Sequence, residues 1–244
     1  MSFLQHLEEL RQRLIRCLLA LMVGFAACWG FHERIFHVMT EPLRTAYPNT
    51  QFIYTQPTEA FMMYMKMSFF VGIFVAAPFI LYQIWAFVAP GLYAHEKIYV
   101  IPFVVLGSLF FAAGAAFGHL VLFPVTFRFL GEFAGEDMSF LPKVSEYYSF
   151  YAWFLLGLGI VFQLPVLILV LARIGLVTPG FLLRQFKYAV LGAFVLAAVI
   201  TPTPDVVTQS LLALPMLGLY LLGVGVAWLF GRPRRKPEEV SGAA

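Results

Sequence analysis

Six long stretches of this sequence contain no Asp, Glu, Lys or Arg, and they constrain its fold more than any other feature. They span residues 17–31, 67–94, 98–127, 147–172, 188–204 and 206–231. A helix needs about 20 residues to cross a hydrocarbon core of ~30 Å. Charged residues make up 12% of the chain and hydrophobic residues 61%, whereas soluble domains carry about 25% charged and 45–50% apolar residues. The sequence therefore predicts an all-α polytopic membrane protein.

We expect one six-span membrane domain over residues 1–231. The predicted spans are residues 14–31, 67–89, 98–127, 147–172, 188–200 and 206–230. Arg16 can lie within the first span because long basic side chains reach the membrane surface from helix ends. The fifth span is short, because Pro202 and Pro204 leave only ~20 Å of helix before them.

Basic residues predict how the spans are oriented. An even number of spans places both termini on one side of the membrane. That side would hold eleven Lys and Arg residues and the other side five: Arg34, Arg44, Lys66, Arg128 and Lys143. Cytoplasmic loops carry the excess of basic residues. Both termini are therefore predicted to be cytoplasmic, with residues 32–66 as a periplasmic cap loop and residues 232–244 as a disordered tail.

Several kinds of chemistry leave no motif in this chain. The sequence contains no G-x-x-x-x-G-K-[ST] loop, no H-E-x-x-H motif or Cys/His cluster, and no G-x-S-x-G motif. We therefore expect no enzymatic activity, no cofactor, no metal and no nucleic-acid partner. A secondary transporter or a structural membrane scaffold remains an alternative. Buried acidic residues and internal repeats, which favour a transporter, are not visible in the predicted spans.

Two acidic residues stand out near the N-terminus. Apolar residues recur at positions 3, 4, 7, 10 and 14, which predicts an amphipathic helix that continues into the first span. Glu8 and Glu9 lie on it, although an anionic inner leaflet repels carboxylates. One interpretation is pairing within the helix, of Glu8 with Arg11 and of Glu9 with Arg13 or His6. The other is a binding role.

Glu96 presents the same alternatives. It lies between His95 and Lys97 in the shortest predicted cytoplasmic loop. A carboxylate there can simply stabilise the N-terminus of the next helix. Alternatively, Glu96 and Glu9 face one another across a cytoplasmic patch and bind guanidinium groups, whose planar fork matches a carboxylate. Composition leaves both interpretations open.

Six segments resemble the TatC family, the large polytopic subunit of the twin-arginine protein translocase. In chain order they are HLEELRQRL (6–14), EPL (41–43), ILYQIWAFVAPGLYAHEK (80–97), FPVTFRFL (123–130), QLPV (163–166) and ITPTPDVVTQSLLALPM (200–216). The resemblance implies a concave six-helix bundle in the cytoplasmic (inner) membrane. It also implies recognition of Arg-Arg signal peptides of folded precursors, export driven by the proton motive force, and an oligomer with small single-span subunits of the TatA and TatB type.

The resemblance also implies site residues. The match to L-x-E-L-R selects Glu9 over Glu8. The implied signal-peptide site consists of Glu9, Arg11, Phe87, Pro90, His95, Glu96 and Lys97.

Three further residues carry implied roles elsewhere. Gln163 stands where many relatives have Glu, so a partner helix would dock on it through a hydrogen bond without a charge. Pro42 belongs to the periplasmic cap, and Asp205 is the acid of the tight outer turn.

Overall fold

The computed structural model describes residues 3–48, 50–88, 100–131, 141–201 and 205–231. Apart from an isolated bridge between Ile53 and Lys143, the regular structure of these residues is helical. Eleven segments follow in chain order: α1 (Phe3–Trp29), α2 (His32–Ala46), α3 (Glu59–Val88), α4 (Val100–Phe117), the π-helical turn η3 (Gly118–Leu122), α5 (Phe123–Gly131), α6 (Val144–Val161), α7 (Leu164–Arg173), α8 (Pro179–Arg184), α9 (Phe186–Ile200) and α10 (Val206–Phe230).

Five helical stretches are long and apolar enough to cross a membrane. They are Leu4–Trp29, Glu59–Phe87, Ile101–Gly131, Val144–Arg173 and Val206–Phe230. The remaining predicted span, the fifth at residues 188–200, corresponds to the shorter apolar helix Phe186–Ile200. These helices confirm the expectation of an all-α polytopic membrane protein whose fifth predicted span is short.

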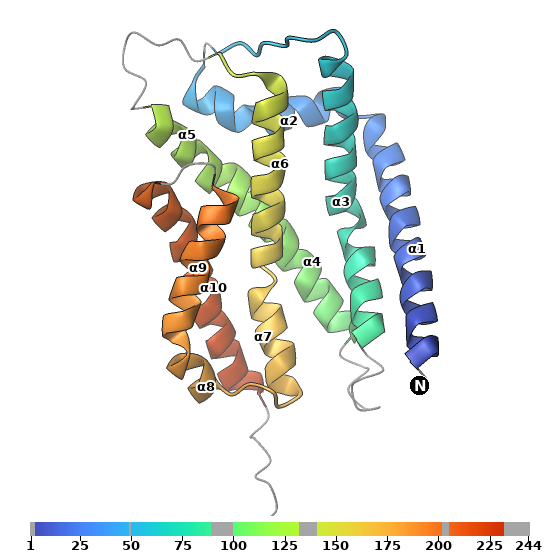
Figure 1. The fold of residues 1–244 in the computed structure, drawn as a ribbon, viewed down its shortest axis with the longest axis vertical. Helices are drawn as coiled ribbons and strands as arrows, with labels where there is room; N and C mark the ends of the chain where they lie inside the picture. The colour runs from blue at the N-terminus through green and yellow to red at the C-terminus, as the bar shows by residue number, and fades with distance from the viewer. Residues whose placement is uncertain (1–2, 49, 89–99, 132–140, 202–204, 232–244) are drawn as a thin grey trace, which may run out of the picture.

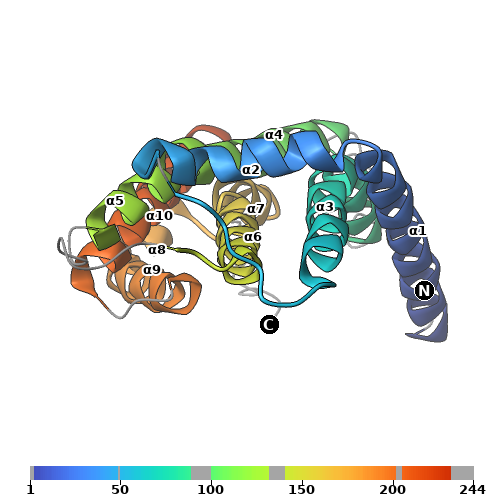
Figure 2. The same cartoon turned by 90° about the horizontal axis from the view of Figure 1, so that it is seen from above.

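The long helices run between two ends of the molecule, and α2 lies across one of them (Figure 1). α1 begins and α10 finishes at the opposite end, which we call the N-terminal end; the other is the α2 end. Viewed from the α2 end, the helices follow an arc that has α1 at one extreme and α9 at the other (Figure 2). The arc places α1 beside α3 alone among the long helices.

Two of the expected spans are interrupted where a proline removes a backbone donor. Pro124 follows the π-helical turn η3, in which the Phe123 N–H donates to the Gly118 carbonyl five residues back. Pro165 lies in the first turn of α7, and the chain leaves α6 just before it.

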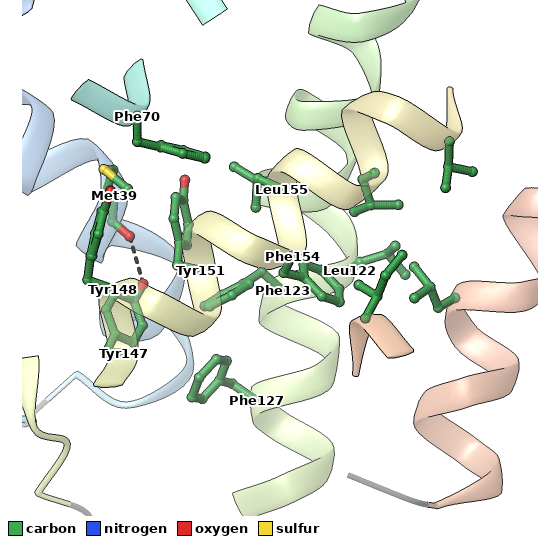
Figure 3. Close-up of a cluster of buried hydrophobic side chains, with 14 of the residues drawn as sticks. Met39, Phe70, Leu122, Phe123, Phe127, Tyr147, Tyr148, Tyr151, Phe154 and Leu155 are labelled. Carbon is green, nitrogen blue, oxygen red and sulfur yellow. Dashed lines mark hydrogen bonds between the residues drawn. The ribbon is translucent and has the colours of Figure 1, made fainter. Parts of the chain in front are cut away.

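Aromatic side chains fill the core below α2 (Figure 3). Phe123 of α5 is completely buried, and the rings of Tyr147, Tyr151 and Phe154 surround it at 4.9–5.8 Å between centroids. The Tyr147 hydroxyl donates to the Met39 carbonyl at 2.7 Å, which ties α6 to α2. These contacts fix α2 on the end of the bundle.

The segment expected as the cap loop contains more helix than the sequence suggested. α2 alone covers 15 residues of this segment. α3 begins at Glu59, eight residues before the expected start of the second span. Its first turn is stabilised by the Glu59 carboxylate, which accepts hydrogen bonds from the backbone N–H groups of Thr55 and Gln56 at 2.8 and 3.3 Å.

Candidate functional site

Two glycines set how α1 and α3 lie against each other. A Cβ atom on Gly24 would lie 2.7 Å from the Gly72 carbonyl oxygen, and one on Gly72 would lie 2.8 Å from the Phe25 nitrogen. The backbones of the two helices therefore touch at this crossing. The helices run in opposite directions (Figure 1), so residues equally distant from the crossing, one toward the start of α1 and one toward the end of α3, lie at the same level.

Arg13 and Gln83 are such a pair. Arg13 precedes Gly24 by 24 − 13 = 11 residues, and Gln83 follows Gly72 by 83 − 72 = 11 residues, which is about 16 Å of helix in each case. The Arg13 Nη1 atom donates to the Gln83 Oε1 atom at 3.2 Å. Gln83 is only 4% exposed. The glycine contact thus brings a cation of α1 onto a buried amide of α3.

Arg13 also binds Glu9. Its Nε and Nη2 atoms donate to the Glu9 Oε1 atom at 3.0 and 2.6 Å. The side chains of the pair are only 19% and 23% exposed. Glu9 is therefore fixed near α3 at the N-terminal end, and pairing within the helix, one of the two interpretations of the sequence, is confirmed for Glu9.

Glu8 and Arg11 have a different environment. Their side chains are 54% and 72% exposed, with a separation of 3.7 Å between Arg11 Nη1 and Glu8 Oε2. An exposed pair of this kind contributes little to stability. The structure therefore separates the neighbouring acids: Glu9 is partly buried and paired with Arg13, which binds α3, and Glu8 is exposed.

Phe87 lies at the same end of α3. Its ring stacks on the His6 ring of α1 with a centroid distance of 4.4 Å and an interplanar angle of 19°. Of the residues predicted for the signal-peptide site, the structure thus brings Glu9 and Phe87 to the α1–α3 contact, and it places Arg11 on the exposed face of α1. Pro90, His95, Glu96 and Lys97 lie outside the described residues, so the facing of Glu9 and Glu96 stays a prediction.

Gln163 borders an apolar groove between α3, α6, α7 and α9. The groove has a volume of about 520 Å³, and its walls include Trp85, Trp153 and Leu196. The Gln163 Nε2 atom donates to the Gly107 carbonyl of α4 at 2.8 Å. A side chain on residue 107 would meet the Gln163 amide, since a Cβ there would lie 3.1 Å from its Oε1 atom.

Comparisons with known proteins agree on one family. The family model described as Sec-independent protein translocase protein (TatC) matches residues 5–215. The chain is 43% identical to the Sec-independent protein translocase protein TatC of Koribacter versatilis, with coverage of 100% of this chain and 91% of the relative. The corresponding protein of Escherichia coli K12 is 38% identical, with 96% and 91% covered. This chain belongs to the TatC family.

A solved structure supports the fold of this TatC-family chain. A crystal structure described as the twin-arginine translocase receptor TatC superposes with a TM-score of 0.81 at 36% identity, over 93% of this chain and 100% of that one. The chain is accordingly a multi-pass membrane protein of the twin-arginine pathway, and its class of activity is protein transport.

The TatC resemblance also implied roles for Pro42, in the periplasmic cap, and for Asp205, in the tight outer turn. Pro42 is buried within α2. Asp205 precedes α10, and its Oδ1 atom accepts a hydrogen bond from the Thr208 backbone N–H at 2.6 Å. Asp205 is thus the N-cap of α10.

Sequence reasoning missed the roles of two residues of the α1–α3 contact: Gln83 as the partner of Arg13, and His6 as the partner of Phe87. A lone amide in an apolar stretch was the only available signal for Gln83, and it carries no information on its partner. Within the described residues, no group of three or more His, Cys, Asp or Glu side chains could hold a metal ion.

Proposed function

We propose that this TatC-family chain receives Arg-Arg signal peptides at its N-terminal end, in the cytoplasm, and nucleates the complex that exports folded proteins. The observation that carries the proposal is Glu9. Its carboxylate is partly buried and is held by Arg13, which is itself bound to Gln83 of α3, whereas the adjacent Glu8 is exposed. A partly buried carboxylate that is already fixed is suited to bind a cation of a partner, because its side chain loses less conformational entropy on binding.

The proposed site combines Glu9 with Glu96, and Arg11, Phe87, Pro90, His95 and Lys97 surround them. α3 ends and α4 begins at the N-terminal end, the end of the molecule that also holds Glu9 (Figure 1). A hydrogen bond to a charged group nets ~1.5–3 kcal/mol, so two arginines would supply roughly 3–6 kcal/mol. Micromolar affinity needs about 8 kcal/mol. The apolar segment of the signal peptide must therefore contribute to binding.

The proposed orientation has six spans in the inner membrane and both termini in the cytoplasm. α9 has 15 residues, or about 22 Å of helix, so a thinned bilayer or neighbouring helices would accommodate it. Eleven basic residues against five support this orientation. A fluorescent protein fused after Ala244 should then fluoresce, whereas alkaline phosphatase at the same place should be inactive. Active phosphatase would contradict the orientation.

Small single-span subunits of the TatA and TatB type are the proposed partners, and export is driven by the proton motive force. The apolar groove beside Gln163 supports a docking place for a partner helix, where an amide can hydrogen-bond without a charge. The sequence has no nucleotide-binding loop, which is consistent with an energy source other than ATP.

Site-specific cross-linking tests the proposal. Membranes containing wild-type protein, Glu9→Ala, Glu96→Ala or Glu8→Ala are offered a signal peptide that carries a photoreactive group beside its arginines. Glu9→Ala and Glu96→Ala should each lower cross-linking about tenfold or more, since each removes a charge-assisted contact. Glu8→Ala is the matched control, because it removes an exposed carboxylate from the same helix.

Other outcomes of this cross-linking experiment would contradict the proposed site. Wild-type cross-linking in Glu9→Ala and Glu96→Ala would overturn the site and favour a structural scaffold. A loss confined to Glu8→Ala would show that the neighbouring acid is the receptor. A Lys-Lys peptide should cross-link weakly to wild-type protein, because an ammonium group cannot reproduce the bidentate guanidinium geometry.

A further inference from the structure

The two carboxylate oxygens of Glu59, at the start of α3, have different surroundings. Oε2 accepts hydrogen bonds from the Thr55 and Gln56 backbone N–H groups and from the Thr55 hydroxyl, the last at 3.3 Å. In the part of the chain that the structure describes, no donor meets Oε1 in hydrogen-bond geometry, although this atom is buried and Glu59 is only 9% exposed. A buried acceptor without a donor is costly, so Oε1 requires a donor that the described residues do not supply.

Glu59 lines a pocket between the first turns of α3 and α6. The pocket has a volume of about 230 Å³, and Met62 of α3 and Ser145 of α6 are among its walls. The Ser145 side chain lies close to the Glu59 carboxylate. A single water needs only ~10–15 Å³ of such space. The pocket therefore has room for a group much larger than one water beside the carboxylate.

Hydrogen bonds hold the walls of this pocket in place. The Tyr148 hydroxyl of α6 donates to the Lys66 carbonyl of α3 at 2.6 Å. The chain before α3 is tied to the chain before α6, because the Ile53 N–H donates to the Pro142 carbonyl at 3.2 Å and the Val144 N–H donates to the Ile53 carbonyl at 3.0 Å. The pocket is thus formed by the fold itself.

Two basic side chains line the same pocket, Lys66 of α3 and Lys143 just before α6. The two ion pairs of the described residues, Glu8–Arg11 and Glu9–Arg13, involve neither lysine. The pocket therefore combines one accepting carboxylate oxygen with two ammonium groups. This combination is complementary to a ligand that carries a positive donor group and an anionic group side by side.

The pocket lies at the level expected for lipid headgroups. The apolar stretches that begin at Glu59 and Val144 are long enough to cross a membrane, and both start at the α2 end (Figure 1). α3 has 30 residues, or about 45 Å of helix, whereas the hydrocarbon core measures ~30 Å and the bilayer with its headgroups ~40–45 Å. The first turns of α3 therefore reach into the headgroup region.

We propose that this pocket binds the headgroup of a phospholipid that carries a primary ammonium group beside its phosphate, the chemistry of phosphatidylethanolamine. The ammonium group donates to Glu59 Oε1, and the phosphate accepts from Lys66 and Lys143. The acyl chains leave the pocket past Met62 into the surrounding bilayer. The pocket lies at the end of the molecule opposite to the proposed signal-peptide site, so the inference does not depend on that function.

Binding of matched lipids to the purified protein in detergent tests the inference. Native mass spectrometry compares phosphatidylethanolamine with phosphatidylcholine of the same acyl chains, offered in equal amounts. Wild-type protein should bind phosphatidylethanolamine about fivefold or more in excess, because a trimethylammonium group has no N–H to donate to Glu59 Oε1. A wild-type ratio near one would overturn the inference.

Glu59→Gln reverses the hydrogen-bonding character of the pocket and preserves the start of α3. The amide oxygen can still accept from Thr55 and Gln56, so the amide N–H₂ replaces Oε1 as a donor. The preference for phosphatidylethanolamine should then fall below about twofold, and an unchanged preference would contradict the role of Glu59. Glu33→Gln, at an exposed position of α2, is the matched control and should keep the wild-type ratio.

The lysines should act on both lipids together, because both lipids carry the phosphate. Lys66→Gln and Lys143→Gln should each lower the binding of both lipids about threefold or more and leave their ratio unchanged. Arg34→Gln, which removes an exposed cation of α2, is the control and should change neither. Undiminished binding in both lysine variants would overturn the assignment of the phosphate.

Methylated headgroups test the inference in wild-type protein without any substitution. The monomethyl and dimethyl derivatives of phosphatidylethanolamine keep an N–H group and should bind within about twofold of the parent lipid, so the loss should come only with the third methyl group. A gradual loss with each methyl group would indicate selection by size and would contradict the hydrogen bond. Soluble phosphoethanolamine at the concentration of the lipid should displace less than about a tenth of it. Complete displacement would identify a small phosphate ester, and not a lipid, as the occupant.

Discussion

Gly24 and Gly72 bring the backbones of α1 and α3 into direct contact, because a Cβ atom on either would come within 2.8 Å of the backbone of the other helix. Close approach of this kind is typical of membrane helices, which associate through packing and not through exclusion of water. Here the contact has a second consequence. It sets the level at which Arg13 meets Gln83, and hence the place of Glu9.

Gly24→Ala should loosen this helix pair. The added Cβ would lie 2.7 Å from the Gly72 carbonyl oxygen, so the backbones must move apart, at a cost of about 1–3 kcal/mol in the free energy of unfolding. Thermal unfolding of the purified protein in detergent measures this change. The matched control is Gly218→Ala on α10, where a Cβ has nothing within 4 Å and alanine is the better helix former. Equal effects of the two substitutions would contradict the role of the crossing.

Tyr147→Phe should detach α2 partly from the bundle. The substitution removes the hydrogen bond from the Tyr147 hydroxyl to the Met39 carbonyl (Figure 3) but keeps the ring in the aromatic core. We expect a loss of about 0.5–1.5 kcal/mol in the free energy of unfolding and faster proteolysis within α2. Tyr54→Phe, which changes a 67% exposed side chain, should alter neither. A protease pattern identical to wild type in Tyr147→Phe would show that the contact does not hold α2.

Much of this fold follows from the sequence because membrane helices must satisfy their backbone hydrogen bonds internally. Uncharged stretches therefore predict helices, and the i,i+4 spacing of Glu9 and Arg13 predicts their pairing. The extent of α2 could not be predicted in this way. Pro42 disfavours a helix interior, yet the helix continues past it because Pro42 and Leu43 are buried against the core. Local preference gives way there to tertiary packing.

The partner of Arg13 shows where sequence reasoning ends. Gln83 lies 70 residues from Arg13, and only the crossing of Gly24 and Gly72 brings them together. The chain has 19 glycines, and nothing local marks these two as a contact. The prolines did not show where the spans are interrupted: the expected spans 98–127 and 147–172 run through Pro124 and Pro165, and Pro78 and Pro215 lie inside the continuous helices α3 and α10.

Gln163→Glu should destabilise the contact between α4 and the α6–α7 junction. An ionised carboxylate has no donor for the Gly107 carbonyl, whereas the Gln163 amide donates to it at 2.8 Å. The expected loss is about 1–3 kcal/mol in the free energy of unfolding. Chemical denaturation in detergent measures it, and Gln51→Glu, the same change at an exposed position, is the control. Stability equal to wild type in Gln163→Glu would show that the hydrogen bond contributes nothing and that this position accepts an acid freely.

Asp205→Ala should unwind the first turn of α10, because the Asp205 carboxylate accepts the Thr208 N–H at 2.6 Å and alanine leaves that donor unpaired. Loss of an N-cap costs about 0.5–2 kcal/mol. Asp205→Asn should retain most of the stability, since asparagine caps helices about as well as aspartate. Hydrogen exchange of the amides at the start of α10 measures the effect directly, together with thermal unfolding. Equal losses in the two variants would mean that the charge of Asp205, and not its capping oxygen, stabilises the helix.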